Sequence, residues 1–212
     1  MLEKLQIYIE DPNEPYDPFI RVDAVDLSGD DALLSISVRD HHGTLEWSRW
    51  EVKVPGLRDY RILEAYGDLQ VFAGDHVLAL QHTDAQTDLF FRGKPSSPDE
   101  VVGQLLIAHR EVTGGWFAFD RFLNETCNPE ELFELGYGVL AKGPVFLLEA
   151  YEKVLSGASL KANLVNPRPA GSWNGEKWVE DKTPLHVLVL GESYFVAEGF
   201  EERKVSDKAE GQ

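Results

Sequence analysis

Between residues 128 and 157 the hydrophobic positions recur at helical spacing, and we expect the rest of the chain to be organised around this stretch. Its second half carries an apolar stripe made of Leu147, Leu148, Tyr151, Val154 and Leu155. A helix with so narrow a polar strip is normally buried, and it is far shorter than the ~20 apolar residues that span a membrane. We therefore predict a core helix packed on a sheet, with Leu148 almost fully buried.

The beginning of the same stretch carries a helix-capping pattern. Asn128 is followed by Pro129, so an asparagine side chain can accept the first free amides while proline takes the first helical position. The pair Gly143-Pro144 should separate this first helix from the second. Gly136 and Gly138 lie within the first helix, and either the helix tolerates them or it ends there.

Elsewhere the hydrophobic positions mostly alternate with polar ones, which is typical of strands. Alternation or short apolar runs predict strands over residues 19–27, 32–39, 45–54, 76–82, 87–92, 116–123, 160–165, 185–190 and 193–200. Residues 58–66 fit a short helix or a strand equally well. A further helix should begin at Pro98, because Ser97 and Glu100 have the spacing of a capping box.

These elements predict an α+β fold: a mostly antiparallel curved sheet or partly closed barrel, covered by three or four helices. We expect one compact unit over residues 1–212, with residues 93–98 as the alternative boundary between two subdomains. Residues 10–18 contain three prolines and should form an acidic arm, and the polar residues 201–212 should form a frayed tail.

The charge of the chain narrows the choice of partners. The chain contains thirty-seven acidic residues and twenty Lys and Arg residues, which gives a net charge of −17. Because this charge repels phosphate backbones and anionic lipids, we expect no nucleic acid and no membrane as partners. Residues 1–31 hold nine of the acids, as a solubilising surface or as a docking patch for a basic protein or a cation.

The compartment is predicted from the cysteine count and the beginning of the chain. Cys127 is the only cysteine, so no disulfide can form within the chain. Residues 1–10 lack the basic and apolar pattern of a signal peptide. Together these features predict a cytoplasmic protein.

The candidates for chemistry are few, since no catalytic motif is present. His82 with Asp84, or with His109 from the following helix, could form a hydrolytic site. The spacing of these histidines is not diagnostic of metal ligation, so we predict neither a metal nor another cofactor. Cys127 precedes a helix, whose dipole would lower the pKa of the thiol; we favour the other interpretation, a buried and inert cysteine.

Aromatic residues beside polar ones supply the candidate binding residues, because such pairs suit ligand pockets and protein interfaces. They are Trp47, Trp116, Arg121, Trp173 and Trp178. Asn174-Gly175 predicts a type I′ hairpin between the last two tryptophans. At least one of these two rings should be partly exposed, and the hairpin would then meet a partner protein or a second copy of the chain in a homodimer.

We therefore expect a non-catalytic intracellular protein that binds a protein or a small-molecule ligand through an acidic, aromatic-bearing surface. The alternative is a small hydrolase-like enzyme that uses His82, Asp84 and His109. The absence of catalytic motifs favours the first hypothesis.

Overall fold

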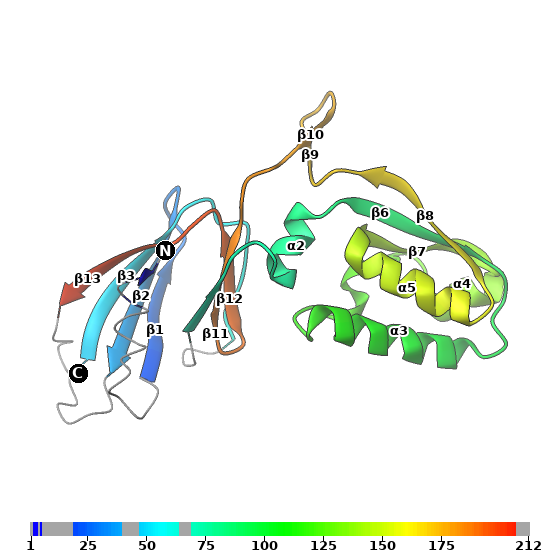
Figure 1. Ribbon diagram of the computed structural model, residues 1–212, viewed down its shortest axis with the longest axis horizontal. Coiled ribbons are helices and arrows are strands. Elements are labelled where there is room, and N and C mark those ends of the chain that lie inside the picture. Colours follow the sequence, from blue (N-terminus) through cyan, green and yellow to red (C-terminus); the bar gives the residue numbers. More distant parts are fainter. Residues whose placement is uncertain (1, 4, 6–18, 40–46, 64–68, 207–212) are drawn as a thin grey trace. The chain divides into compact units, whose positions relative to one another are not determined.

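The computed structural model describes residues 2, 3, 5, 19–39, 47–63 and 69–206. The chain packs as two compact units. Unit 1 comprises Met1–His76 and Thr183–Gln212, and unit 2, Val77–Lys182, is inserted between them (Figure 1). The prediction that residues 1–212 behave as one compact unit, with both units unfolding in one cooperative step, stays a prediction.

Unit 1 is a sandwich of two antiparallel sheets. The first has the order β1 (Phe19–Asp26), β2 (Ala32–Arg39), β3 (Trp47–Val54), β13 (Glu201–Ser206). The second has the order β4 (Asp59–Arg61), β12 (Ser193–Ala197), β11 (His186–Leu190), β5 (Leu69–Phe72). Alternation places Ile36 and Trp50 of the first sheet in one core with Leu188 and Phe195 of the second.

Unit 2 is built on a three-stranded antiparallel sheet. Its order is β7 (Tyr137–Pro144), β6 (Gln86–Arg92), β8 (Lys161–Arg168), and a ribbon of β9 (Gly171–Trp173) and β10 (Trp178–Glu180) follows. The helices are α2 (Val77–Thr83), α3 (Pro98–Thr113), α4 (Pro129–Leu135) and α5 (Val145–Gly157), with a 3₁₀ helix, η1, at Phe119–Phe122. None of the described helices is long and apolar enough to cross a membrane.

Helix α5 is the centre of unit 2. Of the five residues of its predicted stripe, four are fully buried and Val154 is half-buried; the buried ones are Leu147, Leu148, Tyr151 and Leu155. The helix contacts all three strands. Helix α3 packs on α5, and Figure 1 shows both on the same side of the sheet. Because α5 has the sheet on one side and α3 on another, nearly all of its circumference can be apolar.

The capped helix start is also confirmed. The side-chain oxygen of Asn128 accepts a hydrogen bond of 2.8 Å from the backbone N–H of Glu131. The first helix ends at Gly136, whose φ of 82° lies in the left-handed region that glycine enters without strain. The residues that follow form β7 rather than more helix, so the early ending was the correct alternative.

Two predicted strands are helices instead. In place of the strand predicted over residues 76–82, the chain forms α2, because seven residues with apolar positions at Leu78 and Ala79 satisfy a short helix as well as a strand. Asp84 and Ala85 therefore join α2 to β6. Residues 116–123 contain η1, in which Phe119 packs against His109 of α3 and Tyr151 of α5 rather than alternating across a sheet.

The fold class is confirmed as α+β with antiparallel sheets, and the sheets are open rather than closed into a barrel. Residues 201–206 pair with β3 as β13, so the prediction of a frayed end is wrong for them. Residues 93–98 lie inside unit 2, between β6 and α3. The arm at 10–18 and the last residues, 207–212, lie outside the described residues.

We predict that Leu148→Ala lowers the free energy of unfolding by about 2–5 kcal/mol, because it opens a cavity in the centre of unit 2. Urea unfolding measures the loss, and Glu149→Ala on the exposed side of the same helix is the matched control. A loss within about 0.5 kcal/mol, the range of a surface substitution, would contradict a central role for α5.

Candidate functional site

His109 is a structural histidine in the core of unit 2. Its Nδ1 lies 2.8 Å from the hydroxyl of Tyr151, and its Nε2 lies 2.9 Å from the carbonyl oxygen of Phe117. Because a carbonyl only accepts, we assign the ring proton to Nε2, and Nδ1 then accepts from the Tyr151 hydroxyl. Burial raises the pKa of Tyr151, which keeps this donor protonated. Both ring nitrogens are therefore occupied within the core.

Asp84 caps helix α5. One carboxylate oxygen accepts a hydrogen bond of 3.0 Å from the N–H of Phe146, and the other accepts one of 2.8 Å from the N–H of Ala85. Pro144, at the N-cap position, offers no side-chain acceptor. Asp84, in the connection between α2 and β6, supplies that acceptor and places negative charge at the positive end of the helix dipole.

The three candidate hydrolytic residues serve different parts of unit 2. His82 is half-buried on α2, whereas Asp84 lies at the beginning of α5 and His109 contacts Tyr151, further along that helix. Within the described part of the chain, no three His, Cys, Asp or Glu side chains are grouped so that they could hold a metal ion.

Cys127 does not have the activated thiol that its place before a helix suggested. Its Sγ lies 3.4 Å from a carboxylate oxygen of Glu131. Desolvation and this neighbouring negative charge raise the pKa of the Cys127 thiol, which is the opposite of the predicted direction. The glutamate that favours the helix start thus opposes ionisation of the cysteine beside it.

The tryptophan candidates belong to separate regions. Trp47 is half-buried on β3 in unit 1, where the Arg21 guanidinium lies 4.7 Å from its ring centroid. Trp116 is half-buried in unit 2, after the glycines that end α3. The side chain of Trp173 lies outside the described ones.

Trp178 lies at the loop end of the ribbon, where it pairs with Trp173, and it remains partly accessible, as predicted for at least one ring. Its indole N–H donates to the carbonyl of Pro169 at 2.8 Å, and Arg168 lies 5.9 Å from the ring centroid. The predicted type I′ turn is wrong: Trp173 pairs with Trp178, so the loop has four residues, and the Asn174 side chain accepts from two backbone N–H groups within it. Partner binding by this ribbon stays a prediction.

Arg121 lines a pocket of about 360 Å³ beside β7. Its guanidinium lies over the rings of Phe117 and Phe122, at 5.0 and 5.8 Å from their centroids. Lys142 lines the same pocket, together with Asn124. The Asn124 side chain donates to the carbonyl of Val139 at 2.8 Å, so the loop that forms one wall is fastened to the sheet.

Charge is unevenly distributed over unit 2, and sequence reasoning missed this. Helices α3, α4 and α5 together carry eight acidic and two basic residues. The three strands of the sheet carry one acidic and four basic residues. The helix layer is therefore acidic and the sheet is basic, a contrast that the net charge of the whole chain conceals.

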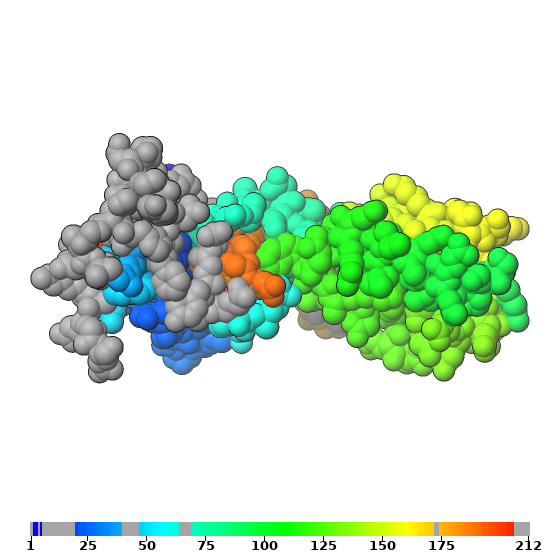
Figure 2. Space-filling view, turned by 90° about the horizontal axis from the view of Figure 1, so that it is seen from below, coloured from blue at the N-terminus to red at the C-terminus, as the bar shows by residue number. Residues whose placement is uncertain are grey.

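The acidic helix surface consists of exposed residues of α3 and α4. Its members are Asp99, Glu100, Ile107, Glu111, Glu130, Glu131, Glu134 and Leu135. Figure 2 shows the side of unit 2 on which α3 lies, in green. Ile107 and Leu135 are 58% and 60% exposed. Arg110, the one basic residue of these two helices, is exposed as well, so the surface carries six carboxylates, one guanidinium and two large apolar side chains.

The basic sheet face is the face of the sheet opposite the core. Leu89 and Phe91 point into the core, so Phe90 and Arg92 point the other way, with their partners on the neighbouring strands. The exposed members of this face are Arg92, Tyr137, Lys142, Lys161 and Asn163. It is thus built from all three strands.

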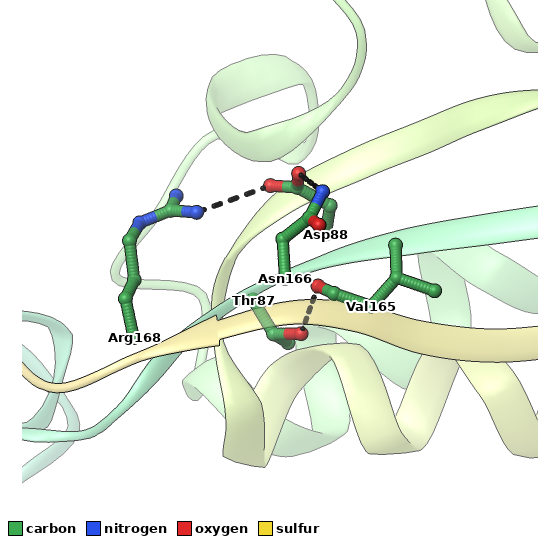
Figure 3. A network of polar contacts seen from close by, with 5 residues as sticks. All are labelled: Thr87, Asp88, Val165, Asn166 and Arg168. Carbon is green, nitrogen blue, oxygen red and sulfur yellow. Dashed lines mark hydrogen bonds and ion pairs between the residues drawn. The ribbon is translucent and has the colours of Figure 1, made fainter.

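The single acidic residue of the sheet, Asp88, is engaged on this face. Its carboxylate accepts a hydrogen bond of 2.9 Å from the Asn166 side chain and lies 3.4 Å from the Arg168 guanidinium (Figure 3). Thr87, on the same strand, donates to the Val165 carbonyl at 2.8 Å. These bonds join β6 to β8 where β8 is irregular, since Asn166 has a φ of 55°.

No known family, curated protein or solved structure matches this chain.

We predict that Tyr151→Phe lowers the free energy of unfolding by about 1–3 kcal/mol, because it leaves the buried Nδ1 of His109 without its donor. Chemical denaturation measures the loss. Tyr60→Phe is the control, since Tyr60 is 44% exposed. Equal stability of the two variants would show that the core does not need this hydrogen bond.

We also predict that Cys127 reacts with iodoacetamide more slowly at pH 8 than a cysteine in a short unstructured peptide. The thiolate is the nucleophile, and a raised pKa leaves less of it at that pH. Glu131→Gln removes the opposing charge and should increase the rate. An alkylation rate above that of the peptide would contradict the raised pKa and show that the thiol is activated.

Proposed function

We propose that this is a non-catalytic intracellular protein that binds a basic partner protein through the acidic helix surface. The observation that carries the proposal is the pairing of exposed apolar side chains with carboxylates on α3 and α4. Apolar side chains that become buried supply much of the affinity of an interface, while complementary charge steers association and selects the partner.

The charge of the rest of the chain supports the same class of partner. Unit 1 carries twenty-two acidic and ten basic residues, and unit 2 carries fifteen and ten. Both units therefore attract cationic molecules at long range and repel anionic ones. A basic protein meets no adverse field as it approaches the acidic helix surface.

The hydrolase alternative receives less support. Both ring nitrogens of His109 form hydrogen bonds within the core. Both carboxylate oxygens of Asp84 accept hydrogen bonds from backbone N–H groups, one from Phe146 in α5 and one from Ala85. A general base must reach a substrate proton within hydrogen-bonding distance. To do so, either residue would have to give up a contact that stabilises unit 2.

The proposal is tested by reversing charge on the acidic helix surface. Immobilised protein captures partners from an extract of its own cells at low salt, and mass spectrometry identifies a basic protein that 0.5 M salt releases. We predict that Glu111→Lys combined with Glu134→Lys weakens binding of that purified protein at least tenfold by calorimetry. Both substitutions lie in last turns of helices, where lysine suits the dipole, so the fold should be retained.

The matched control is Glu176→Lys combined with Glu180→Lys, which changes net charge equally at the exposed ribbon. If both double variants weaken binding by the same factor, only net charge matters and the assignment to α3 and α4 fails. Ile107→Ala and Leu135→Ala should each weaken binding without changing the salt dependence. Unchanged affinity in both of them would remove the apolar part of the proposal.

A further inference from the structure

A row of side chains across the basic sheet face has an arrangement that the fold alone does not explain. Arg92 on β6 pairs directly with Tyr137 on β7 and with Lys161 on β8. Residues paired in this way point to the same face, with Cβ atoms about 4.5–5.5 Å apart. Tyrosine, arginine and lysine therefore stand side by side across all three strands, and Tyr137 is 61% exposed.

Placing two cations directly opposite each other destabilises a sheet unless an anion compensates them. Within the described residues, neither Arg92 nor Lys161 forms an ion pair, and the one carboxylate of the sheet, Asp88, is engaged by Asn166 and Arg168. The excess of carboxylates in unit 2 lies on the helices of the other layer. The row thus carries two positive charges that no carboxylate of its own sheet neutralises, as an anion-binding site would.

The aromatic part of the row narrows the chemistry of that anion. The Arg92 guanidinium lies 5.6 Å from the centroid of the Phe90 ring, which holds the cation over this face. The Tyr137 ring, on the other side of Arg92, is accessible to a planar ligand. A phosphate bound between Arg92 and Lys161 would place an attached planar group within reach of that ring.

We propose that this row binds a free nucleotide, with its phosphates on Arg92 and Lys161 and its base stacked on Tyr137. Arginine and lysine match phosphate oxygens in charge and hydrogen bonding, and an exposed aromatic ring accepts any base. The site lies on the layer opposite the acidic helix surface and does not depend on the proposed protein partner.

The size of the patch favours a single nucleotide over a polynucleotide. Charges are screened over about 8 Å at physiological ionic strength, so a ligand confined to the row meets mainly its local cations. A long strand would extend beyond the sheet to surfaces of a chain whose net charge is −17. An acidic peptide would be attracted by the cations but would make no use of Tyr137.

The test is a calorimetric titration of the full-length protein with ATP, pyrophosphate, adenosine, a ten-residue thymidine oligonucleotide and a ten-residue glutamate peptide. ATP should bind more tightly than pyrophosphate, and adenosine should bind weakest of the three. Arg92→Gln and Lys161→Gln should each weaken ATP binding about tenfold or more, whereas Lys153→Gln, on the exposed side of α5, should leave it unchanged. Thermal melting checks that each variant is folded.

Tyr137→Ala separates stacking from charge. It should weaken ATP binding about five- to a hundredfold, the range expected for one stacked base, and leave pyrophosphate binding within twofold. No ATP binding at millimolar concentration, or equal loss in the Lys153 control, would overturn the site. Tighter binding of the oligonucleotide or of the glutamate peptide than of ATP would overturn the assignment to a free nucleotide.

Discussion

Unit 2 depends on the burial of one helix, α5, against the sheet β7-β6-β8. Each large apolar side chain that leaves water on folding contributes about 1.5–3 kcal/mol, and α5 buries four of them completely. Such a helix also needs partners for the free amides of its first turn. Asp84 and Ala85, which precede β6, supply acceptors at Phe146 and Val145. The connection from α2 to β6 therefore fixes where α5 begins.

The same packing accounts for the difference between the two layers of unit 2. The apolar side of α3 packs on α5, and α5 packs on the sheet, so the polar sides of both helices face water. These polar sides are rich in glutamate and aspartate. The sheet buries the alternate residues Leu89 and Phe91, so the residues between them are placed on the opposite face. Those residues and their neighbours are mostly basic or aromatic. Two surfaces of opposite charge result from one core.

The candidates for catalysis illustrate how packing can remove polar groups from chemistry. His109 lies on the buried side of α3, where a ring nitrogen without a partner would cost free energy, and Tyr151 and Phe117 satisfy both nitrogens. Cys127 lies beside a helix start that is rich in glutamate, so its surroundings oppose the thiolate. In each case the residue type suggested reactivity, and the neighbouring groups oppose it.

The sequence by itself determined the features that depend on neighbours along the chain. These include the cap at Asn128, the apolar stripe of α5, the meander of β1, β2 and β3, and the α+β class. It could not separate a seven-residue helix from a strand at α2, because so short an apolar pattern fits both periods. It also gave no sign that Tyr137, Arg92 and Lys161 form one row, since they are far apart along the chain. Only the register of β6 with β7 and β8 brings them together, and that register is set by which side chains the core accepts.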